Sequence, residues 1–290
     1  MNVRKLTSAL AIAGIMSLPA IAQAITVAGI NFPAGLVFET ANLFEAEDFS
    51  KPGNGDGVIQ VGEYLLGIGY VTSIQDAANN VVWSNGQNGK ELTIKISNYL
   101  AQSASTTPVG GPIFLDQILF SGGNVEIYSQ DVGTFSAAGS QAAGVASVSG
   151  GANNVLFLSL VGSPLGGYAP DGITPITLES DGLRNGGNPF ETAFNLSGRG
   201  FLDITGGVAA GYFDTDTFLC GASSGAPCPD LADKTFSSSS QLAATAGTSW
   251  TSRGTGEIYD YAIPEPASLA LLGIGLLGIG FGRRKAAAAA

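Results

Sequence analysis

Short runs rich in β-branched and aromatic residues alternate with clusters of Gly, Asn, Pro and Ser along residues 25–263. This pattern is typical of an all-β fold with many turns, and it predicts a sandwich or jelly roll. In Glu91–Ser97 apolar and polar residues alternate, as in a strand with one face in water. Val155–Val161 is almost wholly apolar, which predicts a strand covered on both faces. The clearest strand candidates are 64–74, 80–84, 91–97, 113–120, 124–129, 155–161 and 201–208.

Glycine-containing turns separate several of these candidates. Asn85-Gly86 and Asn88-Gly89 lie between two predicted strands. Gly122-Gly123 predicts a tight hairpin that joins two further candidates. Ser136–Gly151 is low in complexity and rich in Ala, Gly and Ser, so we expect a long loop there.

The first residues have the pattern of an export signal. Arg4 and Lys5 precede an apolar stretch from Leu6 to Ile21, and Ala22-Gln23-Ala24 forms a small-x-small cleavage site. We therefore expect signal peptidase to remove residues 1–24 by cutting after Ala24. An uncleaved membrane anchor is the alternative.

The carboxyl-terminal segment has three parts in a fixed order. Pro264-Glu265-Pro266 breaks the chain, Ala267–Phe281 carries no charge, and the basic residues Arg283, Arg284 and Lys285 follow. As a helix of ~1.5 Å per residue the apolar run is about 23 Å long, so it crosses a ~30 Å hydrocarbon core only with local thinning. The basic cluster predicts a cytoplasmic end and leaves the Pro-Glu-Pro motif outside.

This tail resembles the PEP-CTERM sorting signal of Gram-negative bacteria, which combines a Pro-Glu-Pro motif, a short hydrophobic helix and an Arg-rich end. The resemblance implies that exosortase, a membrane protease, removes the tail, and that the mature protein reaches the cell surface or an exopolysaccharide matrix. The predicted organisation is a signal peptide at 1–24, a β-rich extracellular domain at 25–262, the sorting signal with its transient inner-membrane helix at 263–285, and a tail at 286–290. An ordinary single-span anchor is the alternative.

Charge narrows the range of partners. The 290 residues are 45% hydrophobic and 12% charged, which is enough apolar material for one folded domain. Residues 25–263 include seven basic and 22 acidic residues, which gives this part of the chain a net charge of about −15. Such a surface repels phosphate, so nucleic acid is not an expected partner. Acidic polysaccharide is repelled too unless divalent cations bridge the two.

The sequence contains no histidine. Ser-His-Asp and Cys-His catalysis and HExxH zinc sites are therefore excluded. Carboxylate chemistry remains, and acidic pairs such as Glu45/Glu47, Glu179/Asp181 and Asp214/Asp216 are where a glycosidase would have to be built. Solvated strand faces carry such pairs without catalysis, so we expect a protein that is not an enzyme. Several aromatic residues offer stacking faces for sugars or side chains for the core: Trp83, Trp250, Tyr168, Tyr212, Phe213 and Tyr259.

The segment Asn54–Glu63 resembles the second half of an EF-hand or dockerin-type calcium loop. In that register Asn54, Asp56, the Val58 carbonyl and Glu63 are the expected ligands. Pro52 stands where the pattern has its first aspartate. The alternative is a Gly-rich turn whose polar side chains cap their own backbone. Calcium is the one cofactor that the sequence suggests.

Cys220 and Cys228 are the two cysteines of the chain. In an oxidising compartment a local disulfide between them is the expected state. Two free thiols are the alternative.

Three segments of the predicted domain resemble the flocculation-associated subgroup of PEP-CTERM proteins: GIGYVTSI (67–74), ILFSGGNVEIYSQ (118–130) and FLDITGGVAAGYFDTDTF (201–218). The resemblance implies a non-enzymatic role with exopolysaccharide in flocs or biofilm. A secreted carboxylate-dependent glycan hydrolase and a calcium-dependent carbohydrate-binding module are the alternatives.

Overall fold

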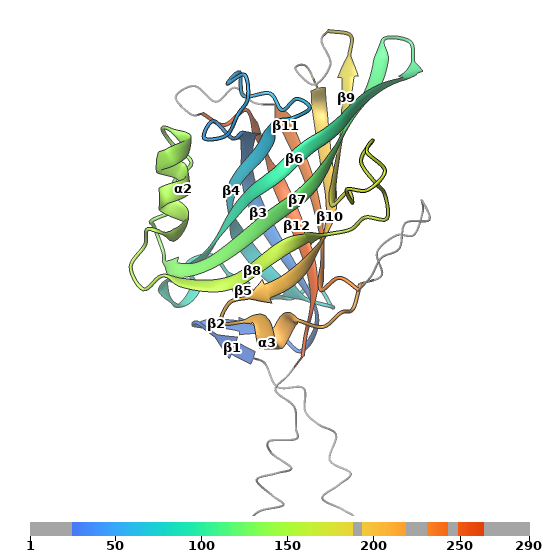
Figure 1. Ribbon diagram of the computed structural model, residues 1–290. Coiled ribbons are helices and arrows are strands. Elements are labelled where there is room, and N and C mark those ends of the chain that lie inside the picture. The colour runs from blue at the N-terminus through green and yellow to red at the C-terminus, as the bar shows by residue number, and fades with distance from the viewer. Residues whose placement is uncertain (1–24, 188–192, 219–230, 243–248, 264–290) are drawn as a thin grey trace, which may run out of the picture.

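The computed structural model describes residues 25–187, 193–218, 231–242 and 249–263. Strands dominate it, so the predicted all-β class is confirmed (Figure 1). The strands are β1 (Ile25–Val27), β2 (Ile30–Phe32), β3 (Gly35–Glu47), β4 (Tyr64–Asp76), β5 (Val81–Ser84), β6 (Lys90–Gly110), β7 (Ile113–Asp131), β8 (Val155–Ser163), β9 (Leu178–Asn185), β10 (Ala193–Gly206), β11 (Lys234–Leu242) and β12 (Ser252–Ala262). The helical elements are η1 (Gln87–Gly89), α2 (Gln141–Ser149) and α3 (Ala210–Phe213).

One 10-stranded antiparallel sheet forms the body of the molecule, in the order β11-β12-β3-β4-β6-β7-β8-β10-β9 with β5 beside β4. The sheet closes on itself because β10 also pairs with β11. The sequence patterns pointed to a sandwich or jelly roll, whereas the structure has a single closed sheet. Alternation along a strand shows that one face is covered, but it does not tell whether a second sheet or the far wall of the same sheet covers it.

β8 and β9 share one place in the ring between β7 and β10. β9 pairs with the first half of β7, from Ile113 to Phe120, and β8 pairs with the second half, from Asn124 to Ser129. On the other side β10 meets β9 with its first half and β8 with its second half. The two strands therefore lie end to end, and the long loop between them crosses the outside of the sheet.

The predicted hairpin at Gly122-Gly123 is wrong, because the two strand candidates around it are one continuous strand, β7. Both glycines have positive φ, 72° and 100°, and the pairing with β6 shifts register nearby at Ala101 and Ser103. A Cβ atom on Gly123 would lie 2.1 Å from the Tyr99 ring. These glycines let the long strand β7 bend around the Tyr99 side chain. In the sequence, a Gly-Gly pair at such a bend looks the same as a Gly-Gly pair in a turn.

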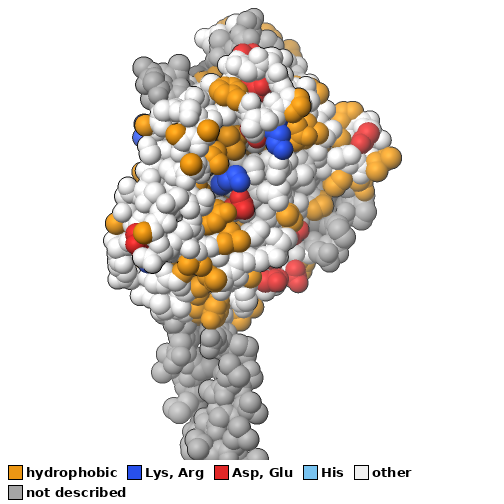
Figure 2. Space-filling view, turned by 60° about the vertical axis from the view of Figure 1, so that its left-hand side comes forward, with side chains coloured by type: hydrophobic (Ala, Val, Ile, Leu, Met, Phe, Trp, Pro, Cys, Tyr) orange, Lys and Arg blue, Asp and Glu red, His pale blue; other side chains and the backbone are white. Residues whose placement is uncertain are grey.

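Ser136–Gly151 is not simply a loop, because it contains the helix α2. The Ser140 side chain accepts a hydrogen bond from the Ala143 N–H at 3.2 Å and begins the helix as an N-cap. α2 packs on the outside of the sheet, where Val148 joins a second apolar cluster with Ile68 and Trp250. In the view of Figure 2, with this side of the molecule turned forward, charged side chains are few and hydrophobic ones are scattered.

The strand predicted at Glu91–Ser97 lies within β6, and Leu92, Ile94 and Ile96 are buried inside the closed sheet as expected. Its other face is not wholly in water. Glu91 and Thr93 are 3% and 0% exposed, because α2 and residues 132–135 cover them. The Glu91 carboxylate accepts hydrogen bonds from the Gln130 amide and from three consecutive backbone N–H groups, those of residues 133–135. A polar residue on the outer face is therefore a structural anchor for the segment that leads to α2.

The β1–β2 hairpin and α3 cover one end of the closed sheet (Figure 1). Phe32 of β2 lies 5.5 Å from Phe157 and 4.9 Å from Phe213 of α3, measured between ring centroids. All three rings are fully buried. The last described residue is at this end too, since the Ile263 N–H donates to the Tyr212 carbonyl at 2.8 Å. The described chain therefore begins and ends at the same end of the molecule.

Among the residues that the structure describes, no helix is both long enough and apolar enough to cross a membrane. The predicted tail helix, 267–281, lies outside those residues, and so do the signal peptide and the tail at 286–290.

Candidate functional site

Several predicted site residues fall outside the described part of the chain. These are the signal peptidase site (Ala22, Ala24), the sorting motif (Pro264, Glu265, Pro266, Arg283, Arg284, Lys285) and the cysteines of the predicted disulfide (Cys220, Cys228).

In the predicted calcium loop, polar side chains accept hydrogen bonds from the backbone N–H groups of the loop itself. The Glu63 carboxylate accepts the N–H groups of Asn54 and Gln60 at 2.9 and 2.8 Å. Asp56 accepts the Val58 N–H at 2.8 Å. Asn54 accepts the Asp56 N–H at 2.9 Å in return. This arrangement matches the alternative of a turn whose polar side chains cap its backbone.

Glu47 completes this loop, and the sequence did not single it out for that role. It is 1% exposed, and its two carboxylate oxygens accept the N–H groups of Gly55 and Gly57, each at 3.0 Å. Glu47 and Glu63 together turn four carboxylate oxygens toward backbone amides. Each of these oxygens accepts one backbone N–H group, which is the role that a self-capped turn assigns to its acidic side chains.

Within the described ranges, the acidic residues Asp214, Asp216 and Asp233 bring carboxylate oxygens within 4.8 Å of one another. Asp233 already accepts the N–H groups of Thr215 and Asp216 at 2.6 and 2.8 Å. The group therefore has a structural task, which is to hold the chain after α3 against the start of β11.

An internal cavity of about 110 Å³ occupies the half of the closed sheet away from β1 and α3. Apolar side chains such as Leu43, Ile96 and Phe120 form most of its wall. The glycines of β10, Gly198 and Gly200, also line it and leave space where larger side chains would fill the interior. The cavity is comparable to apolar cavities of ~150 Å³ that hold a benzene molecule.

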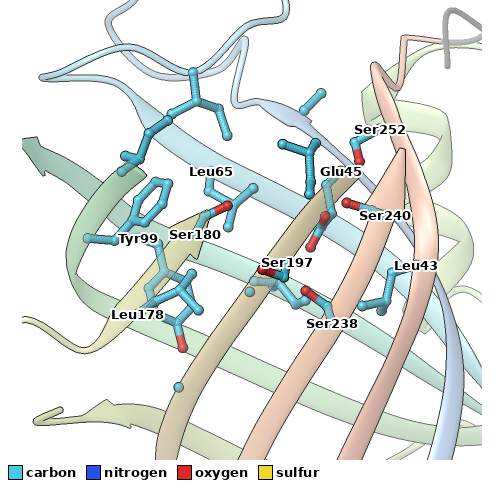
Figure 3. A pocket seen from close by; sticks show the side chains of 18 of the residues that line it. Leu43, Glu45, Leu65, Tyr99, Leu178, Ser180, Ser197, Ser238, Ser240 and Ser252 are labelled. Atoms are coloured by element: carbon cyan, nitrogen blue, oxygen red, sulfur yellow. The ribbon is translucent and has the colours of Figure 1, made fainter. Parts of the chain in front are cut away.

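A polar strip crosses this apolar wall. The hydroxyl groups of Ser238, Ser240 and Ser252, on the neighbouring strands β11 and β12, lie near the carboxyl group of Glu45 (Figure 3). In β11 Ser238 and Ser240 face the cavity, and Ser237 and Ser239 alternate with them on the outer face. The run SSSS is therefore one strand with hydroxyl groups on both faces. In the sequence Glu45 stands out only as one member of an acidic pair. No sequence pattern indicates that its carboxyl group lies inside the closed sheet.

Glu45 is a carboxyl group of the cavity whose pKa departs clearly from its ordinary value. Its side chain lines the cavity inside the sheet and keeps part of its surface accessible there. This burial raises the pKa of Glu45 from 4.5 to about 7. Among the described residues its carboxyl oxygens form no hydrogen bond or ion pair. The cavity thus holds one carboxyl group that is available to a ligand.

A buried ion pair lies at the cavity end of β7 and β9. Arg184 Nε donates to Asp116 Oδ2 at 2.7 Å, and both side chains are buried. Thr106 donates to the other oxygen of Asp116 at 2.7 Å, and the guanidinium lies 4.3 Å from the Phe114 ring centroid. Both ions bind each other and further groups, so this pair helps to fix the register of β9 against β7. Glu45 differs from Asp116 in having no cationic partner among the described residues.

An outer groove of about 400 Å³ lies between β7, β9 and β10 and the loop that joins β8 to β9. Tyr168 on this loop is 44% exposed. The loop holds itself in shape, because Asp171 accepts the N–H groups of Ile173 and Thr174, each at 2.9 Å. Its hydrogen bonds keep the tyrosine ring at the groove without help from a ligand.

Polar side chains line the floor of this groove. The Gln117 amide donates to Glu179 at 2.5 Å and to Asp181 at 3.1 Å. Arg199 Nε donates to Glu179 at 2.6 Å, and its guanidinium is largely exposed. Burial, assisted by the neighbouring Glu179 charge, raises the pKa of Asp181 above its ordinary value.

The acidic pairs and aromatic residues that the sequence marked have different positions. Glu45 and Glu47 do not act together, since one lines the cavity and the other binds the loop. Glu179 and Asp181 both accept hydrogen bonds from the Gln117 amide, and of the two Glu179 lines the groove. Trp83 and Trp250 belong to the core at 0% and 2% exposure, and of the marked aromatic residues Tyr168 is the one at the groove.

Comparison with known proteins gives one informative match. The model of the PEP-CTERM protein-sorting motif matches residues 262–285. No curated protein matches the sequence. Among solved structures, the attachment invasion locus protein Ail of Yersinia pestis is similar over 79% of this chain and 97% of its own, with 8% identity and a TM-score of 0.14.

The matched segment coincides with the Pro-Glu-Pro motif, the apolar run and the basic end that the sequence predicted as a sorting signal. It begins at the last residue of β12, so the motif follows the folded domain directly. The chain therefore carries a PEP-CTERM protein-sorting motif, which indicates an exported protein that exosortase processes.

Proposed function

We propose that the exported domain is a non-enzymatic protein of the cell surface or extracellular matrix that binds exopolysaccharide in flocs or biofilm. The observation that carries this proposal is the outer groove, where the exposed Tyr168 ring stands beside Gln117, Glu179 and Arg199. A sugar ring needs an apolar face to stack on and several donors and acceptors for its hydroxyls. An amide, a carboxylate and a guanidinium supply them here on a rigid sheet.

Two further observations support the same role. The sorting signal directs proteins of this class out of the cell, where exopolysaccharide is present. The three segments that resemble the flocculation-associated subgroup lie in β4, β7 and β10 with the residues that follow it, and β7 and β10 form part of the groove. With a net charge of about −15 on residues 25–263, a neutral glycan is the favoured ligand, or an acidic one bridged by divalent cations.

The groove favours binding over hydrolysis. A retaining or inverting glycosidase needs one carboxylic acid and one carboxylate that both face the scissile bond. Glu179 is instead engaged by Arg199 and Gln117, and Gln117 also donates to Asp181. These bonds hold Glu179 through both of its oxygens and Asp181 through one, which favours a fixed role as hydrogen-bond acceptors.

The test is binding of exopolysaccharide purified from the producing cells to the mature exported protein, measured by isothermal calorimetry. Tyr168→Ala removes the stacking face and is expected to weaken binding at least about tenfold, which corresponds to ~1.4 kcal/mol. Tyr261→Ala is the matched control, because Tyr261 is 43% exposed and is not among the residues that line the groove. It is expected to leave binding unchanged.

Two results would contradict the proposal. Equal affinity of the Tyr168→Ala variant and the wild type would remove the groove as the binding site. Release of reducing ends from the polysaccharide, lost in Glu179→Gln or Asp181→Asn, would establish the hydrolase instead. Loss of binding to a neutral glycan on addition of a calcium chelator would favour the calcium-dependent module, because a neutral glycan needs no bridging cation.

The cavity supports a second candidate function, the binding of a small apolar molecule. Its wall is apolar except for the serine strip and Glu45, so the ligand class is a compact hydrocarbon with one basic or hydrogen-bonding group. Benzylamine and toluene are suitable probes, because they differ in the ammonium group that Glu45 would pair with.

A further inference from the structure

A buried lysine lies near the end of the closed sheet that the aromatic rings cover. Lys234, the first residue of β11, is 0% exposed, although lysine is among the residues least often buried. Asp260 of β12 and Glu39 of β3 are equally enclosed, at 0% and 1% exposure. Neither the sequence patterns nor the binding sites described above account for this group.

Strand register brings the three side chains together. Thr235 pairs with Tyr259, so the next step of the same ladder sets Lys234 opposite Asp260. Glu39 pairs with Ile258, two residues from Asp260, and residues two apart on a strand face the same side. The three groups therefore point into the interior from the neighbouring strands β11, β12 and β3.

The Lys234 amine contacts the carboxyl group of Asp260 directly and lies 3.7 Å from Glu39 Oε1. The Phe213 ring centroid is 4.8 Å from the amine nitrogen. Within the described chain, Glu39 Oε2 and Asp260 Oδ1 are buried without any hydrogen-bond partner. One amine can compensate one carboxylate, so this site holds more acid than a salt bridge needs.

We propose that Lys234 and Asp260 condense into an intramolecular isopeptide bond, with Glu39 as the group that carries protons between them. The site supplies each requirement of that reaction. The amine and the carboxyl carbon are held side by side, and such fixed neighbours react as if present at ~10⁵ M or more. The aromatic rings keep out the water that would favour hydrolysis.

The protonation state of the pair also favours condensation. Burial lowers the pKa of Lys234, which favours the neutral amine that can act as a nucleophile. Transfer of a proton from the ammonium to Asp260 turns the ion pair into an amine and a carboxylic acid. In a dry interior the neutral pair is less costly than two charges.

The atoms balance without any further reactant. Lys234 Nζ attacks Cγ of the protonated Asp260, and a new N–C bond forms. The Glu39 carboxylate accepts a proton from the attacking nitrogen and passes it to the departing hydroxyl group. The C–O bond breaks and one water molecule leaves. The product is an amide between β11 and β12, and Glu39 returns to its starting state.

Mass spectrometry of the mature exported protein tests the proposal. The protein is denatured, reduced and alkylated, so that the cysteines do not affect the result. The mass of the wild type is expected to be lower than its amino-acid composition predicts by one water molecule. The masses of the Asp260→Ala and Lys234→Arg variants are expected to equal the masses that their compositions predict. Proteolysis of the wild type is expected to yield one branched peptide that contains both Lys234 and Asp260.

An exposed ion pair gives the matched control. Lys90 Nζ lies 2.7 Å from Asp131 Oδ1, and both side chains are accessible. In the denatured wild type, an amine-reactive label is expected to modify Lys90 fully and Lys234 not at all. Labelling of Lys234 to the same extent, together with a mass that retains the water, would overturn the proposal even if no variant folded.

The Glu39→Gln variant tests the proton carrier. Gln keeps the shape of the side chain, and we expect a folded protein, as judged by circular dichroism, in which the bond does not form within days. Complete condensation in this variant at the wild-type rate would overturn the role assigned to Glu39.

Discussion

Glu45 shows how the position of one residue changes the chemistry of its side chain. The same strand places Glu45 in the cavity and Glu47 beneath the loop at 54–63, where that carboxylate accepts two backbone N–H groups. Glu45 has no comparable donors among the described residues, so burial controls its protonation. A carboxyl with a pKa of about 7 is charged in one part of the neutral range and uncharged in the other.

We expect Glu45→Gln to change how stability depends on pH. With a folded pKa of about 7 and an ordinary value of 4.5, the folded state binds more protons than the unfolded chain between those values. The contribution of Glu45 to the free energy of unfolding is therefore fully present below pH 4.5, and it is lost as the pH rises through 7. The upper bound of this loss over the whole titration is about 3.5 kcal/mol, at ~1.4 kcal/mol per pKa unit. Urea unfolding at pH 5 and pH 8 measures it.

The variant lacks this titration, so its stability relative to wild type is expected to increase from pH 5 to pH 8. Glu257→Gln, a change at an exposed position, is the control and is expected to track the wild type. Parallel pH profiles for wild type and Glu45→Gln would contradict the assignment. At pH 8 benzylamine is expected to raise the melting temperature of wild type more than toluene does, and this preference should disappear in the variant.

At the scale of single elements, α2 depends on a close approach to the sheet. A Cβ atom on Gly144 would lie 2.8 Å from Ile68 Cδ1 and 2.9 Å from Trp250 Cζ2. The helix can reach the sheet because this position has no side chain. Ser140 caps it and Val148 packs in the same cluster, so one small residue in the middle decides the spacing.

Gly144→Val is therefore expected to displace α2 and destabilise the protein by about 1–3 kcal/mol, the usual cost of overpacking. Trp250, which is 2% exposed, should then become accessible and its fluorescence should shift to longer wavelength. Ala142→Val, an exposed position of the same helix, is the control. An unchanged emission maximum in Gly144→Val would show that α2 does not need this contact.

The sequence predicted the strands better than their connections. Runs such as 64–74, 80–84 and 155–161 are confirmed because alternating or continuous apolar residues report local burial. Gly122-Gly123 was mistaken for a hairpin, since positive φ serves a bend as well as a turn. α2 was missed because its Ala, Gly and Ser residues have neither a strong helical periodicity nor charged ends. Its packing against Trp250 comes from a part of the chain about a hundred residues away.

At the scale of the whole molecule, the order in which strands pair determines which residues meet. Lys234, Asp260 and Glu39 come from distant parts of the sequence, and no local pattern connects them. The same holds for Tyr168, Gln117 and Arg199 in the groove. Sequence alone identified the carboxyl-terminal signal, because that signal is local and contiguous. The buried lysine site arises only from the pairing of β12 with β11 and β3, and the groove only from the pairing of β9 with β7 and β10.

A chain that keeps its signal peptide but ends after Ile263 tests the division between domain and sorting signal. Because β12 ends at Ala262, this chain is expected to fold with the melting temperature of the processed protein, within about 2 °C. It should fail to reach the cell surface or matrix, as measured by antibody labelling of intact cells. A large loss of stability would show that the domain extends into the tail. Undiminished surface labelling would show that sorting does not need residues 264–285.

The position of β12 has a mechanical consequence. This final strand is paired along its whole length with β3 and over most of it with β11. If the processed carboxyl terminus is joined to an anchor and the glycan pulls on the rest of the domain, the force runs along the axis of β12. Both ladders of hydrogen bonds are then loaded in shear, so they must fail together rather than one at a time. A domain held by its last strand in this way can transmit tension between neighbouring cells without unravelling from its end.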